Sequence, residues 1–210
     1  MRNQIILTLS IVLLATQSFG YEDKDLEMLL STSECVKCDL SEADLGGYLL
    51  IGASLISSNL TGARLQGADL TNANLSEANL LEANLSEANL FGANLTRANL
   101  AEANLSKAKL SWADLSEANL REAKLREANF SKTNLSRTDL RKSNLQKADL
   151  READLRAADL REAVLVAAYL NEANLDGADM RKANLYRASM RGAILCNTID
   201  PEGGKNNKDC

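Results

Sequence analysis

The sequence contains no histidine, only one proline, and aromatic residues at just 4% of its length. Without histidine, the chain has no imidazole general base, no Ser-His-Asp triad and no histidine-ligated metal site. It also has no glycine-rich phosphate loop and no pair of carboxylates at positions expected to be buried. We therefore predict no enzyme, no cofactor and no metal site. The formal net charge of −5 disfavours binding to nucleic acid.

Long apolar runs are also missing, apart from one near the start of the chain. Residues 1–20 have a basic start, an apolar stretch from Ile5 to Ala15, and then the small residues Ser18 and Gly20. This order is typical of a secretory signal peptide, and the stretch is about half of the ~20 residues that a spanning helix needs. We expect cleavage near Gly20 and Tyr21 and a periplasmic or secreted mature chain without a membrane span. An uncleaved N-terminal anchor is the alternative.

The remaining sequence has a period of five. Every fifth position from Leu40 to Leu195 is Leu, Met or Phe, which makes 32 consecutive repeats without an insertion. Ala lies two residues earlier in 26 of the 32, and Asn or Asp directly precedes the core position in 23. On an α-helix, five residues advance by about 500°, so successive core residues would point in different directions. Along a β-strand, a spacing of five would place them alternately on opposite faces. Neither structure keeps the core residues on one side. A chain that bends every five residues turns Leu and Ala inward. Asn and Asp suit such bends, because they bond nearby backbone and tolerate unusual backbone angles.

These Ala-(Asn/Asp)-Leu-x-x units, as in residues 78–82, resemble the pentapeptide-repeat family over residues 38–196. The resemblance implies an all-β solenoid, a right-handed quadrilateral β-helix of about eight coils with four repeats in each. Coils that stack ~4.8 Å apart would make a rod about 38 Å long. Each face would hold the residue before a core position, the core residue and the two x residues. Faces one to four start at Leu40, Leu45, Leu50 and Leu55 and recur every 20 residues.

Both ends of such a rod need covering, since open solenoid ends expose unpaired backbone. We expect residues 21–37 to form a helical N-terminal cap and residues 197–210 a polar capping loop. The apolar residues expected on the amphipathic helix over the first coil are Leu26, Met28, Leu29 and Leu30.

Four cysteines lie in two pairs at the two ends of the implied rod. Because a disulfide requires Cα atoms no more than ~7 Å apart, only Cys35–Cys38 and Cys196–Cys210 are practical. The second closes a loop of about 15 residues, which the loop-entropy account values at ~3 kcal/mol. For Cys35–Cys38 we favour a structural role over a redox or metal-binding one, since only Lys37 supplies a nearby positive charge and no histidine or second pair is near.

Outward positions are where we expect function. The inward Thr133, Thr138 and Ser143 are expected only to bond local carbonyls. Neighbouring Asp and Arg columns on face one favour a compensated ion network over a calcium site. Residues 21–120 carry 15 acids and 6 bases, and residues 121–195 carry 11 acids and 15 bases, so the halves have net charges of −9 and +4. This polarity would orient the rod on a partner, or it reflects drift during repeat duplication.

Exposed apolar side chains are the stronger signal, because aromatic patches often mark binding sites. The candidate interaction residues form two groups: Val164, Val166, Tyr169 and Tyr186 near the C-terminus, and Phe91 with Trp112 in the middle of the rod. We expect a protein partner; the oligomeric state is left open.

The sequence therefore predicts a non-catalytic, exported scaffold or interaction protein of unknown biochemical role. One alternative, implied by DNA-shaped relatives, is a DNA mimic that binds topoisomerases; the predicted export and the basic C-terminal half oppose it. A second alternative is binding to ice or mineral through a column of hydroxyl groups on face four. This column consists of Ser76, Thr96, Ser116 and Ser136, and Arg156 interrupts it.

Overall fold

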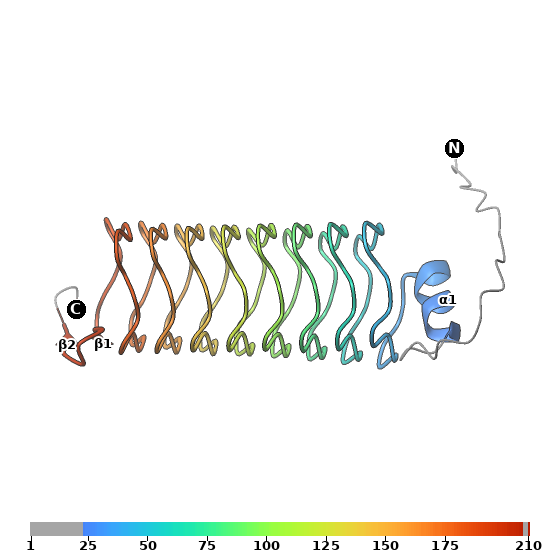
Figure 1. The fold of residues 1–210 in the computed structure, drawn as a ribbon, viewed down its shortest axis with the longest axis horizontal. Coiled ribbons are helices and arrows are strands. Elements are labelled where there is room, and N and C mark those ends of the chain that lie inside the picture. Colours follow the sequence, from blue (N-terminus) through green and yellow to red (C-terminus); the bar gives the residue numbers. More distant parts are fainter. Residues whose placement is uncertain (1–22, 208–209) are drawn as a thin grey trace.

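The computed structural model describes residues 23–207 and residue 210, so the predicted signal peptide lies outside the described part. Its body is a straight solenoid of stacked coils (Figure 1). Helix α1, Asp23–Thr32, lies at one end, and strands β1, Thr198–Ile199, and β2, Lys205–Asn206, lie at the other. The coils are joined by isolated parallel bridges between each residue and the one 20 positions later. One coil therefore contains four pentapeptides. No helix in the described part is long and apolar enough to cross a membrane.

Backbone hydrogen bonds account for the five-residue unit. The carbonyl of each core residue accepts from the N–H of the Ala three residues later, which closes a tight turn. The core residue and the second x residue donate to the following coil, and the Asn or Asp donates to the preceding coil. In the unit that starts at Leu80, these four donors lie 2.7–3.0 Å from their acceptors. Only the N–H of the first x residue lacks a backbone partner in this scheme.

The Asn or Asp side chain supplies the missing acceptor. Each Asn or Asp that directly precedes a core position accepts, through Oδ1, from the N–H two residues later, at 2.9–3.4 Å. We call this contact the Asx bond. The expectation that Asn and Asp bond the backbone at the bends is confirmed.

Their expected unusual backbone angles are not found. Positive φ, from 54° to 72°, falls instead on the second x residue of every unit from Lys37 to Asn197. That residue is glycine in seven units and most often Glu, Lys or Arg in the others. The tight turn runs from the core residue to the Ala three positions later. Its third residue, the one directly before Ala, adopts the left-handed conformation.

Leu and Ala fill the interior, where the core residues from Leu40 to Leu175 are at most 3% exposed. The inward hydroxyls bond carbonyls as expected, although two of them reach into the preceding coil: Thr133 to Leu110 at 2.7 Å and Thr138 to Leu115 at 3.0 Å. Ser143 bonds its own turn. Tyr48 occupies an Ala position yet stays 42% exposed, because the interior is too narrow for a phenol ring.

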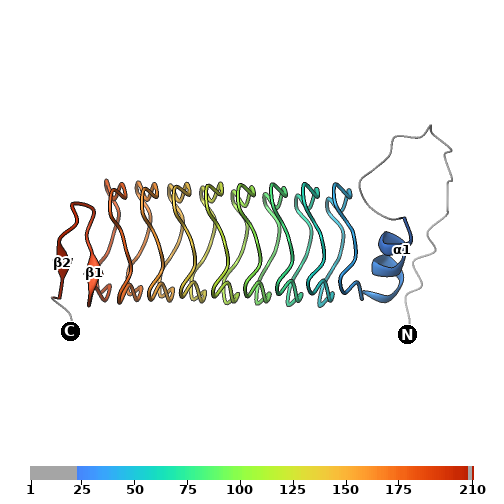
Figure 2. The ribbon, with the colours of Figure 1, turned by 90° about the horizontal axis from the view of Figure 1, so that it is seen from below.

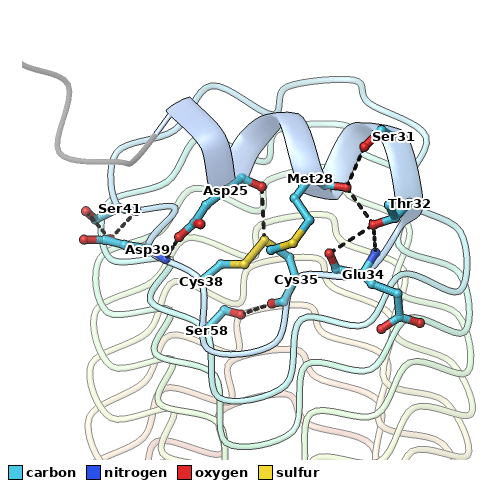
Figure 3. Close-up of a disulfide and its surroundings, with 10 residues drawn as sticks. All are labelled: Asp25, Met28, Ser31, Thr32, Glu34, Cys35, Cys38, Asp39, Ser41 and Ser58. Atoms are coloured by element: carbon cyan, nitrogen blue, oxygen red, sulfur yellow. Dashed lines mark hydrogen bonds between the residues drawn. A yellow bond between two sulfur atoms is a disulfide. The ribbon is translucent and has the colours of Figure 1, made fainter.

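At the N-terminal end, α1 lies across the first coil above the Cys35–Cys38 disulfide (Figure 3). Leu29 is buried and Leu26 packs against the core. The carboxylate of Asp25 accepts from the N–H of Asp39 at 2.8 Å, which fastens the helix to the first face. Met28 and Leu30 remain exposed, so the expected apolar contact is wrong for these two residues. A ten-residue helix turns only one side toward the coil.

At the C-terminal end, the predicted loop contains a two-stranded antiparallel ribbon (Figure 2). β1 continues face one, since Ile199 pairs with Asp179, and β2 pairs with β1. Asp200 closes the turn between the strands by accepting from the N–H of Gly204 at 2.7 Å. The Cys196–Cys210 disulfide, with Cα atoms 4.9 Å apart, fastens Cys210 to the last coil. The sequence does not predict this pairing of β1 with β2, because the stretch is polar and contains glycine.

Candidate interaction surface

The C-terminal group of candidate residues is gathered on neighbouring coils, where face two turns into face three. Val164 bridges to Asn184, and Tyr186 accepts a backbone hydrogen bond from Ala167 at 2.9 Å, so these segments are adjacent. Tyr186 is 62% exposed and Tyr169 50%, while the two valines are half-buried. We call Val164, Val166, Tyr169 and Tyr186 the C-terminal patch.

Phe91 and Trp112 lie on successive coils of face three and form a separate pair. Trp112 is 61% exposed, and the ammonium of Lys132 in the next coil lies 5.1 Å from the centre of its ring. Trp112 also has a positive φ of 64°, a conformation that costs a non-glycine residue roughly 1–2 kcal/mol. Every second x residue shares this conformation, and the contact with Lys132 is the one that the structure shows for the exposed indole ring. Three coils, about 14 Å, separate this pair from Tyr169.

A third exposed apolar group escaped the sequence analysis. Leu49 is 74% exposed on face three of the first coil, beside the exposed Tyr48 and Ile51. The available signal was the repeat itself, because Leu49 stands at an Asn/Asp position and Tyr48 at an Ala position.

A family model described as pentapeptide repeats (8 copies) matches residues 38–77, 83–121, 118–156 and 158–197. The chain belongs to the pentapeptide-repeat family. Among solved structures it is 37% identical to HetL, a pentapeptide repeat protein involved in heterocyst differentiation regulation from the cyanobacterium Nostoc sp. strain PCC 7120. That match covers 82% of this chain and 78% of HetL, with a TM-score of 0.35.

Two further structures match at lower identity. Rfr23, a pentapeptide repeat protein from the cyanobacterium Cyanothece 51142, is 23% identical over 84% of this chain and 97% of its own, with a TM-score of 0.33. A trypsin-treated form of QnrB1, a plasmid-mediated fluoroquinolone resistance protein, is 16% identical over 78% and 91%, with a TM-score of 0.40. None of the curated proteins matches the chain.

Departures from the pentapeptide repeat are concentrated on two faces. Where the residue before a core position is neither Asn nor Asp, the Asx bond is lost, at a cost of about 1 kcal/mol. Face one has no such departure between residues 39 and 179, and face four has one near each end of the rod. Faces two and three hold the others: Leu49, Arg64, Lys109, Lys124, Val164, Tyr169 and Ser189. A local rule that is broken repeatedly in one region indicates selection for something other than the fold.

Face one has instead a regular column of ion pairs. Arg141, Arg161 and Arg181 each contact the Asp two residues earlier, with Nη2–Oδ2 distances of 2.5 Å. Burial alone would raise the pKa of Asp139. The hydrogen bonds and the positive charge of Arg141 lower it by more than burial raises it, so the pKa of Asp139 lies below its ordinary value. The Arg181 side chain likewise lowers the pKa of Asp179. Each carboxylate thus already has a bidentate cation.

Metal ligands and cysteines are the remaining chemical groups of interest. Within residues 23–207, no three His, Cys, Asp or Glu side chains are grouped to hold a metal ion. Cys35 and Cys38 are buried beneath α1 and bonded to each other, which agrees with a structural role. Faces two and three carry the three groups of exposed apolar residues. Most of the lost Asx bonds lie on these same two faces.

Proposed function

We propose that this pentapeptide-repeat protein is a non-catalytic binding rod that presents faces two and three to another protein. The observation that carries the proposal is the exposure of Phe91, Trp112, Tyr169 and Tyr186, at 46–62%, outside the buried Leu and Ala core. Aromatic side chains contribute most to binding when a partner buries them, and here burial is still available.

Export is part of the proposal. Its support is the pattern of residues 1–20 together with two disulfides, a combination that suits an oxidising compartment. In the proposed layout, residues 1–20 are a cleaved signal peptide, 21–37 and 197–210 are caps, and 38–196 are the rod. The right-handed sense and the count of about eight coils, which the family resemblance implies, also belong to the proposal.

Site-specific crosslinking in the cells that make the protein tests the function. A photoreactive residue replaces Trp112 in one variant and Tyr186 in another, and Ser76 on face four in a control. We expect both face-two and face-three variants, but not the control, to capture a protein that mass spectrometry identifies. The proposal is contradicted if neither Trp112 nor Tyr186 captures a protein. It is also contradicted if these two positions and Ser76 capture the same proteins.

Fractionation of the same cells tests export. The expected result is a periplasmic or secreted chain whose N-terminal peptide starts near Tyr21. A cytoplasmic chain that retains residues 1–20 refutes this part.

A further inference from the structure

Most of the net positive charge of the C-terminal half lies on one face. Among residues 121–195, face two carries four bases and one acid. Face one carries six bases and five acids, and faces three and four are balanced. The net +4 of this half is therefore mainly a property of face two.

Together with Lys107 and Lys109, which lie before residue 121, these bases form a ridge along face two that reaches the start of face three. The basic ridge consists of the exposed side chains of Lys107, Lys109, Lys124, Arg126, Lys147 and Arg187. The coil of Leu165 adds no base to it and carries Val164 and Val166 instead. Two acids lie among them from the same coils, and both are already paired. Glu127 contacts Arg126 at 3.2 Å and Lys147 at 3.9 Å, and Asp149 lies 2.6 Å from Arg151. Lys107 likewise contacts Glu87 of the preceding coil at 3.9 Å. Ion pairs thus engage Lys107, Arg126 and Lys147, but the bases outnumber the acids along the ridge, so an anionic partner would meet a positive excess.

The C-terminal patch continues the basic ridge. Lys124 and Val164 stand in the same column, linked by successive bridges through Asn144. Arg187 lies over the ring of Tyr186, with 5.1 Å between the guanidinium carbon and the ring centre. Basic and apolar side chains thus share one side of the rod, with the apolar ones toward its C-terminal end, where Arg187 lies beside Tyr186.

The fold does not require these residues. Lys109, Lys124, Val164 and Tyr169 all occupy Asn/Asp positions, and each forgoes an Asx bond. Neighbouring coils of the same columns keep Asn or Asp and keep that bond, as at Asn144 and Asp149. The basic and apolar side chains therefore weaken the framework locally, which is the pattern expected of a surface selected for binding.

We infer that the basic ridge and the C-terminal patch form one docking surface for an extended acidic segment of another protein, with apolar side chains at one end of that segment. Its carboxylates would lie along the ridge, and its apolar end would cover Val164, Val166, Tyr169 and Tyr186. The four coil steps from Lys107 to Arg187 span about 19 Å, the length of roughly six extended residues. This inference rests on the proposed function and adds the chemistry of the partner.

The charge of the rest of the rod favours a short protein segment over nucleic acid or a lipid surface. Residues 21–120 carry a net charge of −9. A duplex or a planar anionic membrane laid along the rod would meet this charge as well as the ridge, and would be repelled by it. A segment of six to ten residues fits on the ridge alone, and its apolar end has a matching patch.

A labelled peptide tests the inference with the purified chain. The probe is a fluorescein-labelled 12-residue peptide with alternating glutamates and with Leu and Trp at one end. Fluorescence anisotropy measures its binding, and the matched probe has glutamine at each glutamate. We expect the acidic peptide to bind at least about tenfold more tightly than its glutamine counterpart, with affinity that falls as salt rises. Equal binding of the two peptides overturns the inference.

Restoring Asn to the repeat separates binding from folding. The variant Lys109→Asn with Lys124→Asn removes two ridge charges, and the variant Val164→Asn with Tyr169→Asn removes half of the patch. Both regain Asx bonds, so we expect unchanged or higher melting temperatures and a loss of about tenfold or more in peptide affinity. The control, Arg121→Gln with Lys142→Gln on face one, removes the same charge and should change affinity less than about twofold. A control that weakens binding as much as the ridge variant overturns the inference.

Two more probes decide the class of partner. A 20-nucleotide single-stranded DNA and phosphatidylglycerol vesicles should bind at least about tenfold more weakly than the acidic peptide. Tighter binding of either one refutes a protein segment as the ligand. If the peptide fails while Tyr186 still captures a protein in cells, the binding function stands and the acidic chemistry is wrong. If the peptide does not bind and Tyr186 captures no protein, both the acidic-segment inference and the proposed binding function are refuted.

Discussion

Replacing Asn104 by Ala should show what the repeated Asn contributes to the coil. Its Oδ1 accepts from the N–H of Ser106 at 3.1 Å and from the hydroxyl of Ser106 at 2.7 Å. Its Nδ2 donates to Asn84 in the preceding coil at 3.2 Å. A half-buried hydrogen bond contributes about 1 kcal/mol net, and water replaces part of each lost partner. We therefore expect Asn104→Ala to lower the free energy of unfolding by about 1–3 kcal/mol.

Urea unfolding followed by circular dichroism measures this loss, and Asn104→Asp is the matched control. Aspartate keeps the acceptor for Ser106, but it places a carboxylate oxygen instead of an N–H donor opposite Oδ1 of Asn84. If the Asx bond contributes more than this contact between coils, aspartate should cost less than alanine. If alanine costs under about 0.5 kcal/mol, or if aspartate costs as much as alanine, the Asx bond is not what the repeat selects.

Four further outcomes follow from the same contacts. Leu115→Lys places a charge at a position that is fully buried mid-rod, and we expect no soluble folded protein; a soluble variant with an unchanged circular dichroism spectrum would contradict the buried assignment. Cys196→Ser with Cys210→Ser should lower the free energy of unfolding by about 3 kcal/mol or less, measured against the intact chain under oxidising conditions, and an unchanged value would show that the C-terminal ribbon holds without the bond. Because their arginines hold the pKa values of Asp139 and Asp179 below the ordinary value, the stability from these pairs is complete above about pH 5 and is lost as pH falls through 4 and below; thermal melts at pH 7, 5 and 3 should show this loss, more weakly in high salt, and Arg141→Gln should reduce it. A DNA supercoiling assay with a type II topoisomerase should show no effect of the chain, and clear protection of the enzyme would favour the DNA-mimic alternative over a binding rod for exported partners.

Much of the fold follows from the period of five, because only a chain that turns at every unit places Leu40 and each later core residue on the same inside. The location of the positive φ did not follow, since it depends on which residue takes the third place of a turn, and Glu, Lys and Gly all occur there. The β1–β2 ribbon was also missed, because two-residue strands carry no detectable pattern. Their pairing depends on contacts with the last coil.

The candidate site was predicted in part. Tyr169, Tyr186, Phe91 and Trp112 were identified as apolar residues at outward positions, and the structure leaves all four exposed. Leu49 was missed, although it breaks the repeat at the same position as Tyr169. The reason is that the meaning of the Asn/Asp position becomes clear only from its hydrogen bond: once that bond is known, each departure marks a place where the chain gives up stability.

The most direct test of the account is one variant measured in two ways. Val164→Asn with Tyr169→Asn is examined for its melting temperature in solution and for crosslinking from a photoreactive residue at position 186 in cells. If faces two and three are shaped for a partner, the melting temperature is unchanged or higher and the captured protein disappears. A lower melting temperature with the captured protein retained would show that these side chains serve the fold, and would contradict the account.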